Sequence, residues 1–332
     1  MSELVSVYMI TYNHAPWIEK AIRSIMSQIT DFEYKLYVHD DASTDGTTEI
    51  VKRLSEEFPD KIMAFFEEEN QYSKGVKITR TIMSPHFKGK YIASCEGDDY
   101  WVDQYKLQKQ VDYMESHPDC TLCFSNAIIV DTENRKIKKF FSVRSWNDKN
   151  INKKLKSKTG ADFSIEEVIL LDFTPTASNL YRREAYDEIC RFKNGLDLLT
   201  RLVTTSMGYA HYHSEVFTAY RTGNSASASG SIMRSFDKLK KSYLDKHTDI
   251  LNEFDEYTDY KYTEIIQHEI KRKEIELYYN AGKEYYKNIE KHELYRELTA
   301  IKKIKIFSIQ HLGSIVKIYK RMRYKNNTLR KM

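Results

Sequence analysis

Short apolar runs alternate with amphipathic segments over the first hundred residues, and this alternation constrains the fold more than any other feature. The runs 4–10, 34–39, 62–66 and 90–95 are rich in β-branched, aromatic and small residues, as buried strands are. After the first run, Pro16 stands where a helix begins, and apolar residues then recur at helical spacing. Strand–helix alternation with short connections predicts an α/β fold, a right-handed parallel sheet with helices on both faces.

The composition fits a globular chain in a reducing compartment. Of the 332 residues, 41% are hydrophobic and 30% charged, and glycine (11) and proline (5) are few, which favours helices. Cys120 and Cys123 form a C-x-x-C at the start of the apolar run 121–130, where we expect two reduced thiols in a buried strand. The apolar run 4–11 follows Glu3 and is too short for a signal peptide, and no run is long enough to span a membrane. We therefore expect a cytoplasmic protein.

Three carboxylates follow the fourth apolar run within four residues: Glu96, Asp98 and Asp99, with Gly97 between them. In open α/β sheets, ligands bind at the carboxyl ends of strands. Carboxylates this close repel one another unless a cation or hydrogen bonds offset the repulsion, and paired Asp residues suit Mg²⁺ or Mn²⁺ shared with substrate phosphates. A solvated acidic turn is the alternative interpretation.

A second polar loop, residues 40–46, follows the second run. It superficially resembles a calcium loop, but the twelfth position counted from Asp41 is Lys52 instead of a bidentate Glu, and the flanks are strand and helix. We expect Asp41 to accept a hydrogen bond from a ring N–H of a ligand. Nearby Ser43, Thr44 or Asp45 can cap the following helix, and for Asp45 capping is the preferred role.

Together these segments resemble the family 2 glycosyltransferases with the GT-A fold, a Rossmann-like nucleotide-binding mixed or parallel sheet flanked by helices. The resemblance covers roughly residues 4–130 and rests on the order, spacing and strand-end placement of its parts rather than on any single one. The matching segments are Thr11-Tyr12-Asn13, Ser24 and Gln28, Asp40 to Thr47, Glu96 to Trp101, and Lys106 to Val111.

The resemblance implies a nucleotide-sugar site made of Thr11, Tyr12, Asn13, Asp41, Asp98 and Trp101. It also implies that Asp98 and Asp99 form a "DXD"-type motif, with Asp99 as the direct ligand of Mn²⁺ or Mg²⁺ on the donor diphosphate. A metal there would stabilise the charge that develops on the leaving group. Trp101 is expected to pack against a sugar face, and its alternative role is a core aromatic that anchors the next helix.

The second half supplies the implied catalytic base. By its position in the family pattern, Asp197 is the general base that takes the proton of the acceptor hydroxyl during an inverting transfer. Its alternative role is an N-cap for the helix 198–205. The run 215–221 matches a family strand ending in Tyr-Arg, but Gly223 stands where relatives often carry a histidine, so no histidine ligand is assigned there.

The predicted organisation is a GT-A domain over residues 1–230, with a nucleotide-sugar half to about 101 and an acceptor half beyond it. Residues 133–158 are polar, lysine-rich and without periodicity, which fits either a mobile loop over the acceptor site or a solvated stretch. Residues 231–332 are expected to form a helical C-terminal region. After Glu297 the chain has ten Lys and Arg and no acidic residue, leaving 42 basic against 48 acidic residues, net −6, in the rest.

The expected function is metal-dependent, inverting transfer of a sugar from a nucleotide-diphosphate donor, a UDP-sugar by expectation, to a hydroxyl of a glycan or polyprenyl-linked acceptor. The resemblance places such chemistry in bacterial surface polysaccharide assembly, capsule or O-antigen type. The basic amphipathic segment 301–324 is expected to contact anionic lipid on the inner face of the membrane, the alternatives being docking on the catalytic domain or on a second subunit. No nucleic-acid motif accompanies the basic charge. The rival function is a non-catalytic nucleotide-binding or scaffold protein that recruits partners through its helical tail.

Overall fold

The computed structural model describes residues 3–142, 149–171, 173–192, 197–223, 244–281 and 303. Contacts within the chain divide it into two units, Met1–Ser225 and Ala226–Met332. The predicted division of the first unit into a nucleotide half and an acceptor half stays a prediction. Among the described residues, no helix has the length and apolar character needed to cross a membrane.

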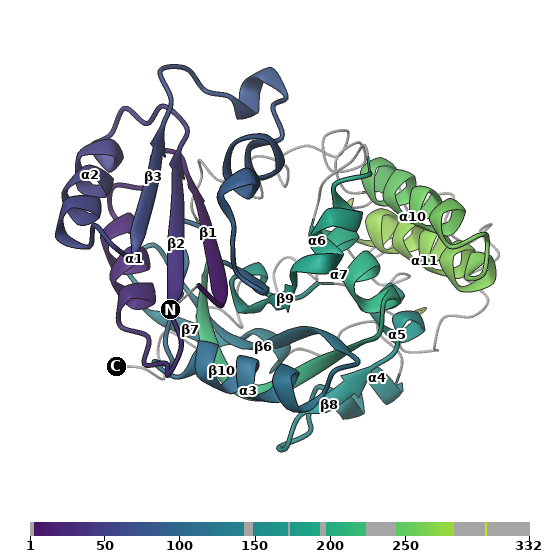
Figure 1. Cartoon of the computed structure of the whole chain (residues 1–332). Coiled ribbons are helices and arrows are strands. Elements are labelled where there is room, and N and C mark those ends of the chain that lie inside the picture. Colours follow the sequence, from purple (N-terminus) through teal and green to yellow (C-terminus); the bar gives the residue numbers. More distant parts are fainter. Residues whose placement is uncertain are drawn as a thin grey trace, which may run out of the picture. The chain divides into compact units, whose positions relative to one another are not determined.

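The first unit opens with the alternation that the sequence predicts, and the described elements follow the predicted bounds closely. Its leading elements are β1 (Val5–Thr11), α1 (Ile18–Met26), β2 (Tyr34–Asp40), α2 (Thr47–Glu57), β3 (Ile62–Phe66), η1 (Tyr72–Lys74), η2 (Thr79–Met83), η3 (Ser84–His86), β4 (Tyr91–Ser94) and β5 (Tyr100–Trp101). Strands β3, β2, β1 and β4 are neighbours in this order and run parallel. Figure 1 shows α1 and α2 together beside these strands.

The second half turns the sheet from parallel to mixed. Its elements are α3 (Lys106–Ser116), β6 (Cys120–Val130), β7 (Lys136–Lys139), η4 (Phe140–Ser142), α4 (Lys149–Lys154), β8 (Ala161–Phe163), α5 (Ile165–Ile169), η5 (Thr176–Ser178), β9 (Leu180–Arg182), α6 (Arg183–Ile189), α7 (Asp197–Ser206) and β10 (Tyr209–Arg221). The complete order is β3-β2-β1-β4-β9-β6-β10-β5, with β7 on β6 and β8 on β10. Strand β9 is antiparallel to both of its neighbours, so a purely parallel sheet is not what forms.

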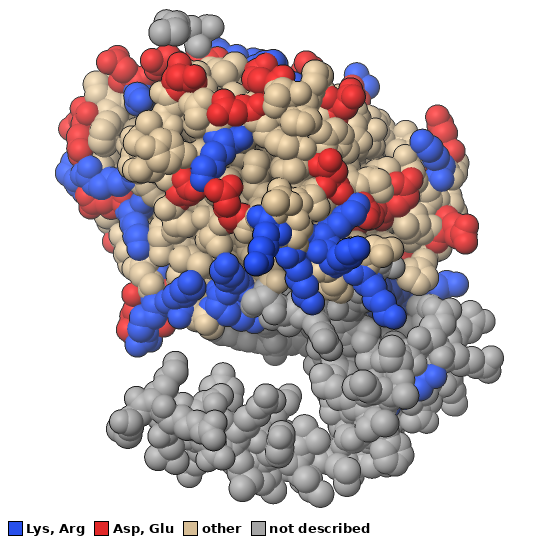
Figure 2. Space-filling view, turned by 90° about the horizontal axis from the view of Figure 1, so that it is seen from below, with Lys and Arg blue, Asp and Glu red and all other residues tan. Residues whose placement is uncertain are grey.

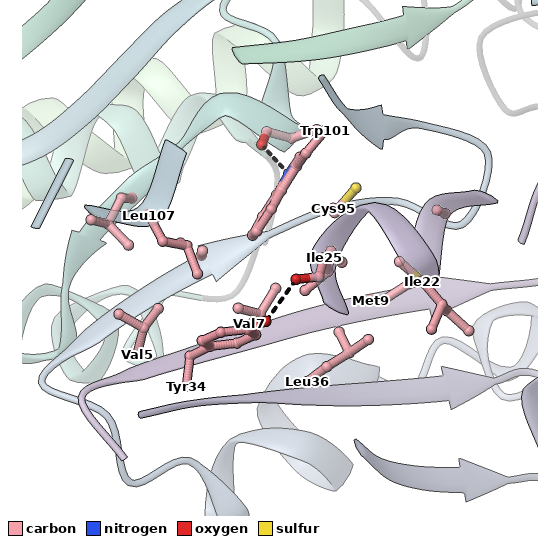
Figure 3. Close-up of a cluster of buried hydrophobic side chains, with 14 of the residues drawn as sticks. Val5, Val7, Met9, Ile22, Ile25, Tyr34, Leu36, Cys95, Trp101 and Leu107 are labelled. Atoms are coloured by element: carbon pink, nitrogen blue, oxygen red, sulfur yellow. Dashed lines mark hydrogen bonds between the residues drawn. The ribbon is translucent and has the colours of Figure 1, made fainter. Parts of the chain in front are cut away.

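The main core lies between β1 and α1, where two periodicities meet. Val5, Val7 and Met9 alternate along β1, and α1 contributes Ile22 and Ile25, all with no exposed surface. Figure 3 shows these side chains in one cluster with Leu36, Cys95, Trp101 and Leu107. The Tyr34 hydroxyl donates to the Ile25 carbonyl at 2.9 Å, which satisfies a polar group inside the cluster.

The long β6–β10 pair is covered on both faces by aromatic contacts. On one face, Tyr113 of α3 stacks on His211 with ring centres 3.6 Å apart, and His213 meets the same tyrosine edge-on. On the other, Phe141 packs against Phe124 and Tyr212. These contacts place both histidines in a packing role.

The second unit is described by two helices, α10 (Lys246–Tyr257) and α11 (Thr263–Ala281). Ile250, Leu251, Phe254 and Ile266 are buried. Asp255 ties the two helices, because its carboxylate accepts a hydrogen bond of 2.8 Å from the Thr263 hydroxyl. The basic segment 301–324 lies outside the described residues apart from Lys303.

Candidate active site

The predicted site residues meet at the carboxyl edge of the parallel strands. Because β1, β2 and β4 run in the same direction, the loops after them emerge side by side. Two backbone hydrogen bonds hold these loops together: Asp41 N–H donates to the Thr11 carbonyl at 3.0 Å, and Gly97 N–H donates to the Ile10 carbonyl at 3.2 Å.

The loop after β1 is held against the loop after β2 by Asn13. Its backbone N–H donates to the Ser43 hydroxyl at 2.9 Å, and its side-chain oxygen accepts from Thr44 N–H at 2.8 Å. Asn13 has φ of 56°, a left-handed conformation that asparagine tolerates better than most residues. Tyr12 is left 46% exposed, whereas the Thr11 hydroxyl is buried without a partner among the described residues.

Asp41 makes contacts that sequence reasoning missed. Its two carboxylate oxygens accept the backbone N–H groups of Gln71 and Tyr72 at 2.7 and 3.1 Å, and Asn70 Nδ2 donates to its carbonyl at 3.3 Å. Asp41 therefore fixes the turn after β3, and Tyr72 stands 71% exposed on that turn. No local pattern indicated this pairing, because thirty residues separate the partners.

Gly97 lets the acidic stretch approach β1 closely. A Cβ atom at this position would lie 2.6 Å from the Thr11 hydroxyl oxygen and 2.8 Å from His14 Nδ1, closer than side-chain contacts allow. The glycine is therefore needed for this close approach. His14 Nδ1 is buried without a partner among the described residues, and burial lowers the pKa of this imidazole.

Asp98 and Asp99 are both nearly buried, with exposed fractions of 9% and 3%. Asp99 Oδ1 accepts the Arg221 backbone N–H at 2.8 Å, and Oδ2 is buried with no partner in the described structure. Burial, followed by the charge of Asp98, raises the pKa of Asp99 well above its usual range. A buried carboxylate oxygen without a partner costs free energy, and a cation shared with a ligand would remove that cost.

Arg221 braces this pair, a role that sequence reasoning did not assign. Its Nε donates to the Asp98 carbonyl at 2.7 Å, and its terminal nitrogens donate to the Asp131 carbonyl at 2.6 Å and to Asn134 Oδ1 at 2.8 Å. The guanidinium carbon lies 5.1 Å from the centre of the Trp17 ring. The Tyr-Arg pair at the end of this strand was the sequence feature that could have pointed to Arg221.

Asp197 joins the site from the start of α7. Its Oδ2 accepts a hydrogen bond of 2.6 Å from the Thr176 hydroxyl, and the Thr176 carbonyl accepts from Ser94 of β4 at 3.0 Å. Asp197 lies close enough to Glu96 for its charge to act on that carboxyl group. Desolvation, followed by the negative charges of Asp197, Asp99 and Asp98, raises the pKa of Glu96 well above its usual range. The fold thus brings carboxylates one hundred residues apart into one neighbourhood.

Trp101 packs inside the protein, as its alternative role of a core aromatic requires. Its side chain is only 4% exposed, and its indole N–H donates to the Ala177 carbonyl at 3.0 Å. Lys106 Nζ lies 4.2 Å from the ring centre. This burial favours the core role, and the expected contact with a sugar face stays a prediction.

The donor set fits a divalent cation that takes further ligands from a substrate. Among the described residues, no group of three or more His, Cys, Asp or Glu side chains could hold a metal. Asp98 and Asp99 supply two carboxylates, one with an oxygen lacking a partner. Mg²⁺ and Mn²⁺ sites commonly combine one or two carboxylates with substrate phosphates and water.

Comparisons with known proteins agree with this geometry. The family model described as Glycosyl transferase family 2 matches residues 6–190. An uncharacterized protein of Mycobacterium tuberculosis is 31% identical over 186 residues, covering 56% of this chain and 49% of the relative. The Escherichia coli UDP-Glc:alpha-D-GlcNAc-diphosphoundecaprenol beta-1,3-glucosyltransferase WfaP is 33% identical over 114 residues, 34% of this chain and 42% of the relative. The chain spans about half the length of the curated relatives it matches.

A solved structure shares the fold over nearly the whole chain. The mannosyltransferase PcManGT from Pyrobaculum calidifontis, in complex with GDP-Man and Mn²⁺, superposes with a TM-score of 0.58 at 16% identity, covering 98% of this chain and 84% of that one. This likeness confirms the predicted GT-A fold with its mixed sheet and C-terminal helices. Because the family model covers more than half of its residues, the chain belongs to glycosyl transferase family 2.

Proposed function

We propose that the protein is a metal-dependent, inverting glycosyltransferase that moves a sugar from a nucleotide-diphosphate donor to an acceptor hydroxyl. One observation carries this proposal: Asp98 and Asp99 lie in the same neighbourhood as Asp197, which comes from a distant element. One carboxylate oxygen of Asp99 is buried and has no partner among the described residues. Family membership supports the same reaction class.

In the proposed reaction, Asp197 accepts the proton of the acceptor hydroxyl as its oxygen attacks the anomeric carbon from the face opposite the diphosphate. The bond between that carbon and the diphosphate oxygen breaks, and the leaving group departs with the electron pair. Thr176 donates to Asp197 Oδ2, which orients the carboxylate and leaves Oδ1 for the acceptor. A bound Mn²⁺ or Mg²⁺ would supply Lewis-acid stabilisation of the charge on the diphosphate.

The nucleotide subsite is assigned to the loops after β1 and β2. We propose that Thr11, Tyr12 and Asn13 contact the base and ribose, together with Asp41 and the turn that it holds. Tyr12 and Tyr72 are exposed aromatic side chains of this group. The proposed donor is a UDP-sugar, since WfaP carries UDP-Glc in its name, although PcManGT was solved with GDP-Man.

The proposed acceptor is a glycan linked to a polyprenyl diphosphate, and the proposed setting is bacterial surface polysaccharide assembly beside the inner face of the membrane. Two relatives support this class of acceptor. WfaP and WfgD of Escherichia coli are both named for glucosyl transfer to GlcNAc-diphosphoundecaprenol.

Thermal unfolding with a panel of nucleotide sugars tests the proposal. We expect one donor to stabilise the wild type when Mn²⁺ is present, by about 2.7 kcal/mol at a hundredfold excess over Kd, and not in EDTA. Asp99→Asn should lose this metal-dependent shift. Asp112→Asn is the matched control, because Asp112 is exposed on α3 and bonds only to Gln108 and Ser116 in the described structure.

Two outcomes would count against the proposal. Equal donor-dependent stabilisation with Mn²⁺ and with EDTA would show that donor binding does not require a metal. An absence of any donor-dependent shift across UDP-, GDP- and other nucleotide sugars would favour the scaffold function instead.

A further inference from the structure

We propose that a lysine-rich surface on the first unit binds the anionic phospholipid headgroups of a membrane. We call it the basic surface and define it by Lys136, Lys138, Lys149, Lys153, Lys156 and Lys158, which lie on β7, on α4 and just after α4. This inference goes beyond sugar transfer, and its lipid-binding test does not depend on any glycosyltransferase activity.

The charge of the basic surface is not neutralised within the described structure. Residues 135–142 and 149–160 contain nine Lys and Arg and no Asp or Glu. All six defining lysines are exposed, and none forms an ion pair with a described residue. Arg135 and Lys154, by contrast, are paired with Asp131 and Glu167 at 2.7 and 2.5 Å. Figure 2 shows Lys and Arg side chains gathered in a band across the face seen from below, with Asp and Glu more frequent above it.

Aromatic packing holds this segment on the sheet and turns its lysines outward. Phe140 packs against Tyr220 with ring centres 5.7 Å apart, and Phe141 packs against Tyr212 at 5.6 Å. Ile151 of α4 is 1% exposed and therefore buries the inner side of that helix. Within residues 133–158, the described parts therefore pack against the sheet through Phe140, Phe141 and Ile151.

Protection of an edge strand against pairing with other chains explains only some of these lysines. Among the described strands, β7 pairs with β6 alone, and lysines on an edge strand discourage pairing with other chains. That explanation applies to Lys136 and Lys138. It does not apply to Lys153, Lys156 and Lys158, which lie on or after a helix.

The chemistry of the basic surface fits lipid headgroups better than other polyanions. Lysine is a flexible point charge that suits a layer of phosphates without fixed geometry. Ile137 stands 55% exposed among the lysines of β7, where it could enter the headgroup layer. No aromatic side chain in the described part of this surface is fully exposed for stacking on nucleic-acid bases.

One end of the basic surface begins beside the candidate active site. In the turn that leads into β7, the Asp131 carbonyl and Asn134 Oδ1 accept hydrogen bonds from the Arg221 guanidinium. The same guanidinium also donates to the Asp98 carbonyl. Membrane contact here would place the acidic pair close to the lipid surface. This last step rests on the proposed function, because only a lipid-linked acceptor needs that proximity.

Vesicle sedimentation with the full-length protein tests the proposal. Wild-type protein should bind vesicles of phosphatidylcholine mixed with phosphatidylglycerol, and binding should fall as salt rises. The triple variant Lys138→Gln, Lys153→Gln and Lys156→Gln should bind ~10²-fold more weakly, at roughly five-fold per lysine near an anionic surface. The control variant Lys52→Gln, Lys77→Gln and Lys88→Gln changes the net charge equally at other exposed lysines and should lose less than about three-fold.

Three results would overturn the proposal: wild-type protein that stays in the supernatant, equal losses in the two triple variants, or equal binding to phosphatidylcholine alone. Thermal unfolding of both variants verifies that they are folded. A fourth result would also contradict the lipid assignment: the basic-surface variant binds soluble polyphosphate more weakly than the wild type does but binds vesicles equally well.

Discussion

At the scale of single residues, Asp197 is the side chain whose two uses can be separated by experiment. It is the first residue of α7, where a negative charge favours the helix N-terminus, and its carboxylate also bonds to Thr176 across the site. We expect Asp197→Asn to keep donor-dependent thermal stabilisation and to lose kcat by ~10²–10⁴-fold, the scale of general base catalysis. A steady-state rate close to that of the wild type would show that Asp197 is not the general base and that another group takes the proton.

Asp41 offers a second residue-scale prediction, because both of its carboxylate oxygens are used by the turn after β3. In Asp41→Ala, the amides of Gln71 and Tyr72 each lose a hydrogen bond to a charged acceptor, and such a bond contributes about 1.5–3 kcal/mol to stability. We expect hydrogen exchange at these two amides to accelerate at least tenfold and donor affinity to fall. Unchanged exchange with reduced affinity would show that Asp41 acts on the nucleotide directly and not through the turn.

At the scale of elements, α3 carries a charged residue into the core. Lys106 has no exposed surface, and its Nζ donates to Gln110 Oε1 at 2.8 Å. Burial lowers the pKa of Lys106 to about 7. In the unfolded chain this pKa is about 10.4, so the unfolded state binds more protons between pH 7 and 10. Stability contributed by neutral Lys106 therefore rises with pH through this window and is lost as pH falls towards 7.

We expect Lys106→Met to remove that rise. Between pH 7 and 9, the free energy of unfolding of the wild type should gain up to about 2.7 kcal/mol relative to the variant. Urea unfolding at both pH values measures the difference, and Lys88→Met serves as the control because Lys88 is exposed. Parallel pH profiles for wild type and Lys106→Met would mean that the amine stays protonated in the folded protein.

At the scale of the whole molecule, charge is distributed unevenly along the chain. Ten basic residues follow Glu297, and the preceding part carries a net charge of −6. Removing residues 301–332 is expected to weaken binding to anionic vesicles, and the loss should add to that of the basic-surface variant if the two regions act independently. Equal sedimentation of truncated and complete protein would favour docking of the tail on the protein itself.

Prediction from the sequence worked best where the signal was local. The apolar runs at 62–66 and 90–95 correctly predicted β3 and β4. The acidic stretch was placed correctly at a strand end, because its glycine and carboxylates are contiguous. The lysine-rich stretch 133–158 had no readable pattern, since β7 is exposed on both faces and shows no alternation.

Local sequence was therefore enough to predict the α/β class, the carboxylates at the strand ends and the family that they resemble. It was not enough to predict the antiparallel insertion of β9, the bracing of Asp98 and Asp99 by Arg221, or the burial of Trp101. Each of these depends on contacts between segments 57 to 123 residues apart, as the Cys123–Leu180 strand pair and the Asp98–Arg221 bond illustrate. Strand periodicity reports which side of an element is apolar, whereas the partner that covers that side is selected only when distant elements pack.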